Sequence, residues 1–135
     1  MNRLIQFLNE KNHFLEKFYN LNKSQISRFE DGLFDDIETF YNKREDLLKI
    51  IKYIDTEIQK AHGLHKDMSG GFNDDDKAEI RNVLRNKEAY VQHILEQDLL
   101  ILGMIDAAKS KIIRELKDVS KARKAMNGYY KVSVA

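Results

Sequence analysis

The stretch LFDDIETFYNKREDLLKIIKYIDTEI, residues 33–58, decides the fold class of this 135-residue chain. Its apolar positions recur at alternating steps of four and three residues, and they are Leu33, Ile37, Phe40, Arg44, Leu47, Ile51, Ile54 and Ile58. This is the heptad spacing of a helix that packs against other helices, with Arg44 as the polar exception. We therefore predict a helix over about 34–62 that contributes one face to a coiled-coil core.

The segment before residue 33 carries a second apolar stripe. Its members stand mostly three or four residues apart, and they are Leu4, Phe7, Leu8, Phe14, Leu15, Phe18, Leu21, Ile26 and Phe29. They predict a helix over about 3–31. Gly32 then fits a left-handed helix end, and Asp35 with Glu38 has the spacing of a capping box. A tight helical hairpin is expected.

A third amphipathic segment follows the hairpin. Residues 63–75 have loop composition and predict a flexible loop, after which Asp76 with Glu79 has the spacing of a second capping box. Heptad spacing then runs through Ile80, Leu84, Lys87, Val91, Ile94, Asp98, Ile101, Ile105, Ala108 and Ile112. We predict a helix over about 76–127, followed by a short C-terminal tail over 129–135.

These segments predict an all-α fold with a single helical domain over 1–135. The expected architecture is an antiparallel three-helix bundle or coiled coil, and no proline interrupts its helices. At 1.5 Å rise per residue the first two helices span about 42 Å and the third about 75 Å, so the third should extend beyond the hairpin. The alternative is a four-helix bundle, if the third helix breaks near Gly103.

An extended third helix leaves the apolar residues of its last third uncovered. We call these residues the C-terminal stripe, and they are Ile112, Ile113, Leu116, Val119 and Met126. An exposed apolar stripe usually marks a contact site, so we expect it to bind a client polypeptide. A homodimer, or a C-terminal part that folds back across the bundle, remains an alternative.

Composition and charge argue against several other classes of protein. The chain has 23 Lys and Arg against 22 Asp and Glu, and the basic residues near the C-terminal stripe accompany no recognised nucleic-acid motif, so nucleic acid is not an expected partner. There is no cysteine, the N-terminal residues are polar, and no apolar run is long enough for a bilayer. We expect a cytoplasmic protein without membrane insertion.

No catalytic constellation is recognisable in the sequence. It contains no phosphate-cradling glycine loop, no arguable Ser-His-Asp set, and only Glu10 with His13 fits the Glu-x-x-His spacing that helical di-iron proteins use twice. We therefore predict neither a metal nor a cofactor, and no enzymatic activity.

The chain resembles the flagellar export chaperones of the FliT and FlgN type. FEDGLFDDI at 29–37 is similar to the family's acidic-glycine turn, and KREDLLKII at 43–51 to its charged-then-dileucine second helix. The FliT-type ending is matched by ILEQD at 94–98, IIREL at 112–116, KARK at 121–124 and Tyr129-Tyr130. The resemblance spans nearly the whole chain.

This resemblance implies a cytosolic type III secretion chaperone. Such a protein keeps an axial subunit, for example the filament cap or a hook-filament junction protein, soluble and delivers it to the export apparatus. The resemblance also implies that Tyr129 or Tyr130 docks on the export gate, whereas packing back on the bundle is the structural alternative for this pair. Without the resemblance, the residues fit a non-enzymatic coiled-coil adaptor or a dimeric assembly protein.

Overall fold

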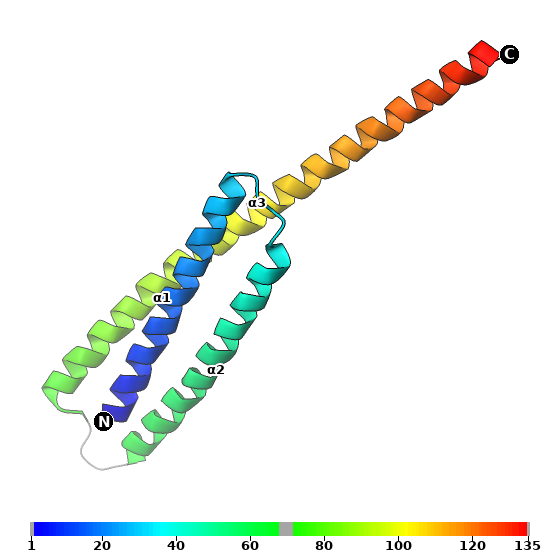
Figure 1. Cartoon of the computed structure of the whole chain (residues 1–135). Helices are drawn as coiled ribbons and strands as arrows, with labels where there is room; N and C mark the ends of the chain where they lie inside the picture. The colour runs from blue at the N-terminus through cyan, green and yellow to red at the C-terminus, as the bar shows by residue number, and fades with distance from the viewer. Residues whose placement is uncertain (1, 68–71, 135) are drawn as a thin grey trace. The chain divides into compact units, whose positions relative to one another are not determined.

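The computed structural model describes residues 2–67 and 72–134, with the side chains of 3–64 and 72–128. It contains three helices over these residues, shown in Figure 1: α1 (Asn2–Glu30), α2 (Ile37–Asp67) and α3 (Asp74–Val134). No strand occurs in the described part of the chain. The predicted all-α fold class is confirmed.

Contacts divide the chain into two compact units, where the sequence predicted one helical domain. The first unit is Met1–Leu100, which holds α1, α2 and the first part of α3, and the second is Ile101–Ala135, which holds the rest of α3. The helical hydrogen-bonding pattern of α3 continues through Gly103, where the four-helix alternative required a break.

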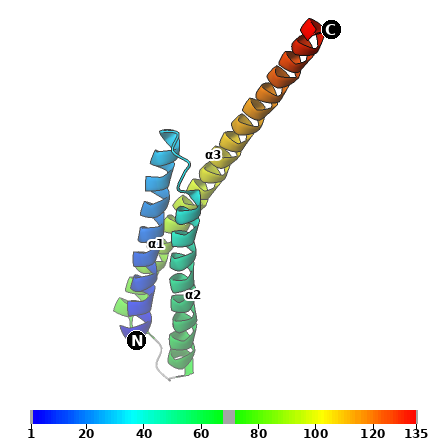
Figure 2. The same cartoon turned by 45° about the vertical axis from the view of Figure 1, so that its right-hand side comes forward.

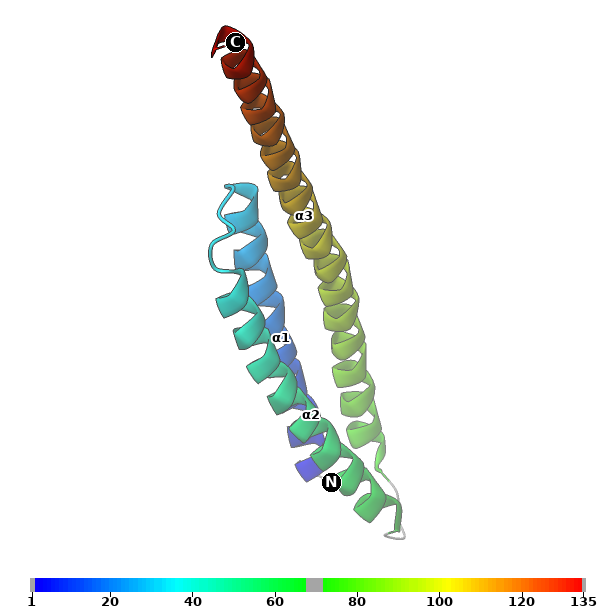
Figure 3. The ribbon, with the colours of Figure 1, turned by 90° about the vertical axis from the view of Figure 1, so that its right-hand side faces the viewer.

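Within the first unit, α1 and α2 lie side by side and run in opposite directions (Figures 2 and 3). Lys11 Nζ of α1 lies 2.6 Å from Asp55 Oδ1 in the middle part of α2. At the hairpin, Arg28 Nε lies 2.6 Å from Asp36 Oδ2. One ion pair therefore joins the middle parts of the two helices, and a second lies at the turn between them.

The first part of α3 packs on this hairpin through two apolar clusters. One cluster joins all three helices through its buried members Leu15, Phe18, Ile51 and Ile94. The other joins Leu4 and Leu8 of α1 to Val83 of α3, with Ile58, Ala61, Phe72 and Ile80 packed around them. Six of the seven buried members of the two clusters belong to the predicted apolar stripes, and Val83 is buried in place of the predicted Leu84, which is 38% exposed. Burial of this apolar surface is the main source of stability in this unit.

The turn after α1 confirms the predicted role of Gly32. Its φ of 79° is left-handed, and among the described residues no other residue has a positive φ. The Gly32 N–H donates to the Phe29 carbonyl at 3.0 Å, and the Leu33 N–H donates to the Arg28 carbonyl at 3.0 Å. These two bonds form a Schellman motif, which satisfies carbonyl groups at the end of α1.

The hairpin turn is longer than predicted, because α2 begins at Ile37 and not at residue 34. The Asp36 carbonyl accepts the N–H of Phe40 at 3.0 Å, so Asp36 is the N-cap residue in place of the predicted Asp35. Leu33, expected in the heptad seam, lies in the turn and is 44% exposed.

The predicted loop over 63–75 is wrong at both ends. Helix α2 continues through Gly63 to Asp67, because a glycine inside a helix costs only about 1 kcal/mol and does not force a stop. Helix α3 begins at Asp74, because Asn73 caps it: the Asn73 Oδ1 accepts the Asp76 N–H at 2.7 Å. Residues 68–71 of this predicted loop lie outside the described residues.

The predicted tail over 129–135 is helical as far as Val134. The sequence Asn127-Gly128 suggested a helix end, but Gly128 keeps a helical backbone within α3. A glycine ends a helix where it adopts the left-handed conformation itself, and Gly128 does not adopt it.

A pH dependence follows from the contacts of Asp36. A hydrogen bond from Gln25 Nε2, 2.8 Å from Asp36 Oδ1, lowers the pKa of Asp36 below its ordinary 3.8, with a smaller contribution from Arg28. A lowered folded-state pKa gives stability above the ordinary value that is lost as the pH falls through the folded-state pKa. We expect Asp36→Asn to lower the thermal midpoint at pH 7 and to have progressively less effect below about pH 4. Thermal unfolding followed by circular dichroism tests this, with exposed Asp106→Asn as the control.

Candidate functional site

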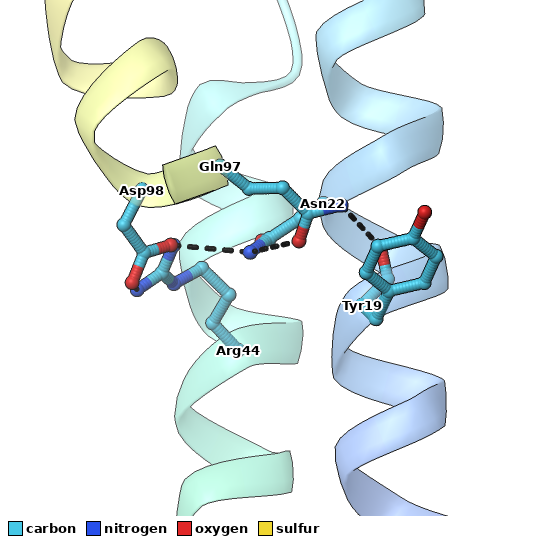
Figure 4. Close-up of polar contacts among 5 residues, drawn as sticks. All are labelled: Tyr19, Asn22, Arg44, Gln97 and Asp98. Atoms are coloured by element: carbon cyan, nitrogen blue, oxygen red, sulfur yellow. Dashed lines mark hydrogen bonds and ion pairs between the residues drawn. The ribbon is translucent and has the colours of Figure 1, made fainter. Parts of the chain in front are cut away.

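The core of the first unit contains one layer of polar side chains contributed by all three helices (Figure 4). We call it the polar layer, and its members are Asn22 of α1, Arg44 of α2, and Gln97 and Asp98 of α3. Arg44 and Asp98 form a two-pronged ion pair, with Nη1 to Oδ1 at 2.7 Å and Nη2 to Oδ2 at 3.3 Å.

Asn22 and Gln97 extend the polar layer from the ion pair to α1. Asn22 Nδ2 donates to Gln97 Oε1 at 3.2 Å and to Asp98 Oδ1 at 3.1 Å. Gln97 Nε2 donates to the Tyr19 carbonyl oxygen at 3.1 Å. One hydrogen-bonded chain therefore links α1, α2 and α3 across the core (Figure 4).

The polar layer lies largely out of solvent. Asn22 is fully buried, and the side chains of Arg44 and Asp98 are 17% and 28% exposed. Aromatic rings surround the Arg44 guanidinium, whose carbon lies 4.9 Å from the Phe18 ring centre and 5.5 Å from that of Phe40. The paired carboxylate and the ring faces both favour the charged guanidinium at this position.

The polar layer is suited to fixing the alignment of the helices. A shift of α3 by one heptad would separate Asp98 from Arg44 and leave each charge in the core without its partner. The layer therefore favours the register in which Arg44 meets Asp98.

The C-terminal stripe continues a buried face of α3. Residues of that face recur every seven positions, and Ile105 among them is only 7% exposed. The next three members, Ile112, Val119 and Met126, are 55%, 51% and 61% exposed. The same helical face therefore changes from buried to exposed between Ile105 and Ile112.

The other two predicted client-binding residues flank this face. Leu116 is 63% exposed and stands beside the line of Ile112 and Val119, whereas Ile113 is 52% exposed and lies further around the helix. All five predicted residues are therefore accessible in the structure, and four of them form one continuous strip.

Positive charge surrounds the C-terminal stripe. Two acidic residues, Glu115 and Asp118, stand among exposed basic residues, which are Lys109, Lys111, Arg114, Lys117, Lys121, Arg123 and Lys124. Counted over the sequence, residues 101–135 carry a net charge of +5 and residues 1–100 a net charge of −4. The near-neutral total thus conceals a strongly basic C-terminal segment.

The predicted export-gate residues Tyr129 and Tyr130 lie in the last turns of α3. Their side chains fall outside the described residues. The role that the resemblance implies for this pair remains a prediction.

The described residues offer no group of three or more His, Cys, Asp or Glu that could hold a metal ion. His13 contacts the Phe14 ring at a centroid distance of 5.4 Å. His93 Nδ1 lies 3.8 Å from Glu96 Oε2 in a pair whose side chains are both more than 60% exposed.

No helix in the described part of the chain is both long enough and apolar enough to cross a bilayer.

An open depression of about 310 Å³ is lined by Lys17, Leu21, Lys43, Asp46 and Leu47 of α1 and α2. Its lining combines two apolar side chains, Leu21 and Leu47, with the charged side chains of Lys17, Lys43 and Asp46.

Two buried amide residues of α1 were not predicted from the sequence. Asn22 and Gln25 are buried, at 0% and 5% exposure. Their positions were recognisable, because the steps from Leu15 through Phe18, Asn22 and Gln25 to Phe29 are 3, 4, 3 and 4 residues. A strict heptad reading of α1 would have placed both amides in the core.

Arg44 and Asp98 were seen as polar members of two seams, but their pairing was not predicted. Opposite charges at seam positions of two helices are a usable signal, because a buried charge requires a partner.

Comparison of the chain with protein-family models, with curated proteins and with solved structures finds no match in any of the three.

Proposed function

We propose that this protein binds a helix of another polypeptide along the C-terminal stripe, and that it acts as a cytoplasmic type III secretion chaperone for a flagellar axial subunit. The observation that carries the proposal is the change from buried Ile105 to exposed Ile112, Val119 and Met126 on one heptad face of α3. Such a face is complete only when another helix covers it.

The proposal includes the finer architecture. The first unit is taken as an antiparallel three-helix bundle, and α3 is taken to extend beyond the hairpin of α1 and α2. The polar layer then has a clear purpose, because a fixed register determines which residues of α3 are covered and which are free for a client.

The chemistry of binding is the burial of apolar surface against a client helix. Covering the exposed half of each of the four side chains in the continuous strip contributes about 1 kcal/mol apiece, and the client face adds a similar amount, giving roughly 8 kcal/mol before costs. Association itself costs at least about 4 kcal/mol. The stripe therefore supports a weak and reversible complex, as a chaperone that must release its client requires.

The flagellar part of the proposal rests on the resemblance of residues 29–37, 43–51 and the end of the chain. The client class that it implies is the filament cap or a hook-filament junction protein. On the same resemblance, Tyr129 or Tyr130 would contact the export apparatus during delivery.

The exposure of the C-terminal stripe also fits one other function, that of a dimeric adaptor. A second copy of the chain could cover the C-terminal stripe, which would make the protein a dimeric coiled-coil adaptor. Light scattering separates the two functions, because it gives mass independently of shape. A dimer that becomes a monomer on Ile112→Asp/Val119→Asp would support the adaptor, whereas a monomer favours the chaperone.

Co-expression tests the chaperone function directly. We expect the full-length chain to co-purify with a filament-cap or hook-filament junction protein of the source organism. The Ile112→Asp/Val119→Asp variant should lose at least about tenfold in affinity, since two charges placed in an apolar contact cost several kcal/mol. Lys117→Asp/Lys124→Asp, on the opposite side of α3, is the matched control and should retain binding. Failure of the full-length chain to bind any axial subunit would contradict the proposal.

A further inference from the structure

We infer that the occupant of the C-terminal stripe is a helix of a different protein whose apolar seam is flanked by acidic residues, and not a second copy of this chain. The inference rests on the proposed helix-binding function and adds the chemistry of the partner. It follows from the charges beside the exposed seam of α3.

The heptad register of α3 assigns each residue near the stripe to a position. Buried Ile105 and exposed Ile112, Val119 and Met126 share one seam position, seven residues apart. The other seam position holds Ala108, Glu115 and Ala122. In a two-helix coiled coil both positions face the partner, and the residues beside them determine which partner is chosen.

Three basic residues stand at the flanking positions of the exposed seam. Lys109, Lys111 and Arg123 are all exposed, and Asp118 is the acidic residue at these positions. Since the flank is predominantly basic, an acidic flank on the partner gives attractive pairs, and a basic flank gives repulsive ones.

Parallel pairing of two copies of this chain is disfavoured by Glu115. In a parallel, in-register pair each seam residue faces its own copy, so the two Glu115 carboxylates would meet at the contact. Two like charges in an apolar contact repel each other and also lose hydration.

Antiparallel pairing of two copies meets the same difficulty at other residues. The register that keeps Ile112, Val119 and Met126 in contact places the two-fold axis close to residue 117. Lys109 then faces Arg123 of the other copy, and Asp118 faces Asp118 of the other copy. Both directions of self-pairing therefore bring like charges together, which favours a partner of different sequence.

The small seam residues Ala108 and Ala122 add a steric preference. Beside Ile112, Val119 and Met126 they leave room for large apolar side chains from the partner. The partner is thus expected to present leucine or isoleucine at its seam and glutamate or aspartate beside it.

Two synthetic peptides of four heptads test the inference. Both carry leucine and isoleucine at the seam, one has glutamate at every flanking position, and the other has lysine there. Like charges along each flank keep the free peptides from pairing with themselves. Binding of each fluorescently labelled peptide to the full-length chain is measured by anisotropy, and light scattering gives the mass of the free chain.

We expect the acidic peptide to bind about tenfold tighter than the basic one at low salt, because each of three exposed ion pairs contributes about a factor of two. The preference should shrink at 0.5 M salt, where the Debye length is only about 4 Å. The Lys109→Glu/Lys111→Glu/Arg123→Glu variant should bind the basic peptide more tightly than the acidic one. The Lys117→Glu/Lys121→Glu/Lys124→Glu variant has the same change in charge and should still bind the acidic peptide more tightly.

The other outcomes separate this inference from the proposed function. Equal binding of both peptides would overturn the acidic partner and leave helix binding intact. Binding of neither peptide would overturn both. A stable dimer of the free chain, dissociated by Ile112→Asp/Val119→Asp, would show that a second copy covers the stripe. An oligonucleotide that binds tightly and displaces the acidic peptide would assign the basic flank to nucleic acid instead.

Discussion

Phe40→Ala is expected to destabilise the protein by about 3–5 kcal/mol, the largest effect predicted for a single substitution in the chain. Phe40 is 2% exposed. Its ring lies edge-on to Phe29 at a centroid distance of 6.5 Å, and the Arg44 guanidinium carbon lies 5.5 Å from its centre. Alanine would leave a cavity at the junction between the hairpin turn and the polar layer, and it would remove one ring face from a largely buried cation.

Urea denaturation followed by circular dichroism measures the effect on the free energy of unfolding. Tyr53→Ala is the matched control, since Tyr53 is an aromatic residue of the same helix that is 63% exposed. Its cost should stay below about 1 kcal/mol. A loss of less than 1 kcal/mol for Phe40→Ala would show that this end of the hairpin is not packed as described.

Asp98→Ala is expected to cost about 2–3 kcal/mol, because it leaves the Arg44 guanidinium in the core without its carboxylate. The side chains are 17% and 28% exposed, which places the effect at the lower end of the range for buried pairs. Replacing both residues should cost less than replacing one, since Arg44→Leu/Asp98→Leu leaves no unpaired charge. We expect this double variant to lie within about 1 kcal/mol of the natural chain.

The double variant also tests whether the polar layer selects the register. The helices of the double variant should adopt more than one register although its stability is retained. Amide hydrogen exchange would show this as faster exchange across α3. Asp106→Ala, at an exposed position of the same helix, is the control for Asp98→Ala. The single variants Arg44→Leu and Asp98→Leu complete the cycle, and effects of these two that add up to the effect of the double variant would contradict a direct interaction between Arg44 and Asp98.

The helices could be predicted from the sequence because their signal is periodic and long. The seam containing Phe40, Ile51 and Ile54 is buried as the heptad spacing predicted, and Gly32 adopts the left-handed conformation expected at a helix end. The helix limits were less predictable. The start of α3 depends on whether Asn73 or Asp76 caps it, and both residue types serve that role.

The candidate site was predictable only in its apolar part. The C-terminal stripe follows from residue spacing along one helix, whereas the polar layer depends on which residues of different helices meet. Asn22, Arg44 and Asp98 are separated by more than 20 residues in the sequence and meet because the hairpin and α3 align in one register. Sequence periodicity identifies such positions, but it does not specify the partners across the core.

The most direct test of the central claim is the protection of a single thiol at the C-terminal stripe. The natural chain has no cysteine, so Ala122→Cys on the seam and Ser110→Cys on the opposite side of α3 each introduce one reactive group. Alkylation rates are measured with and without a filament-cap or hook-filament junction protein of the source organism. We predict at least about tenfold slower alkylation of Cys at 122 in the complex, and little change at 110. Equal rates at 122 with and without a bound axial protein would show that the client lies elsewhere, and would contradict the account.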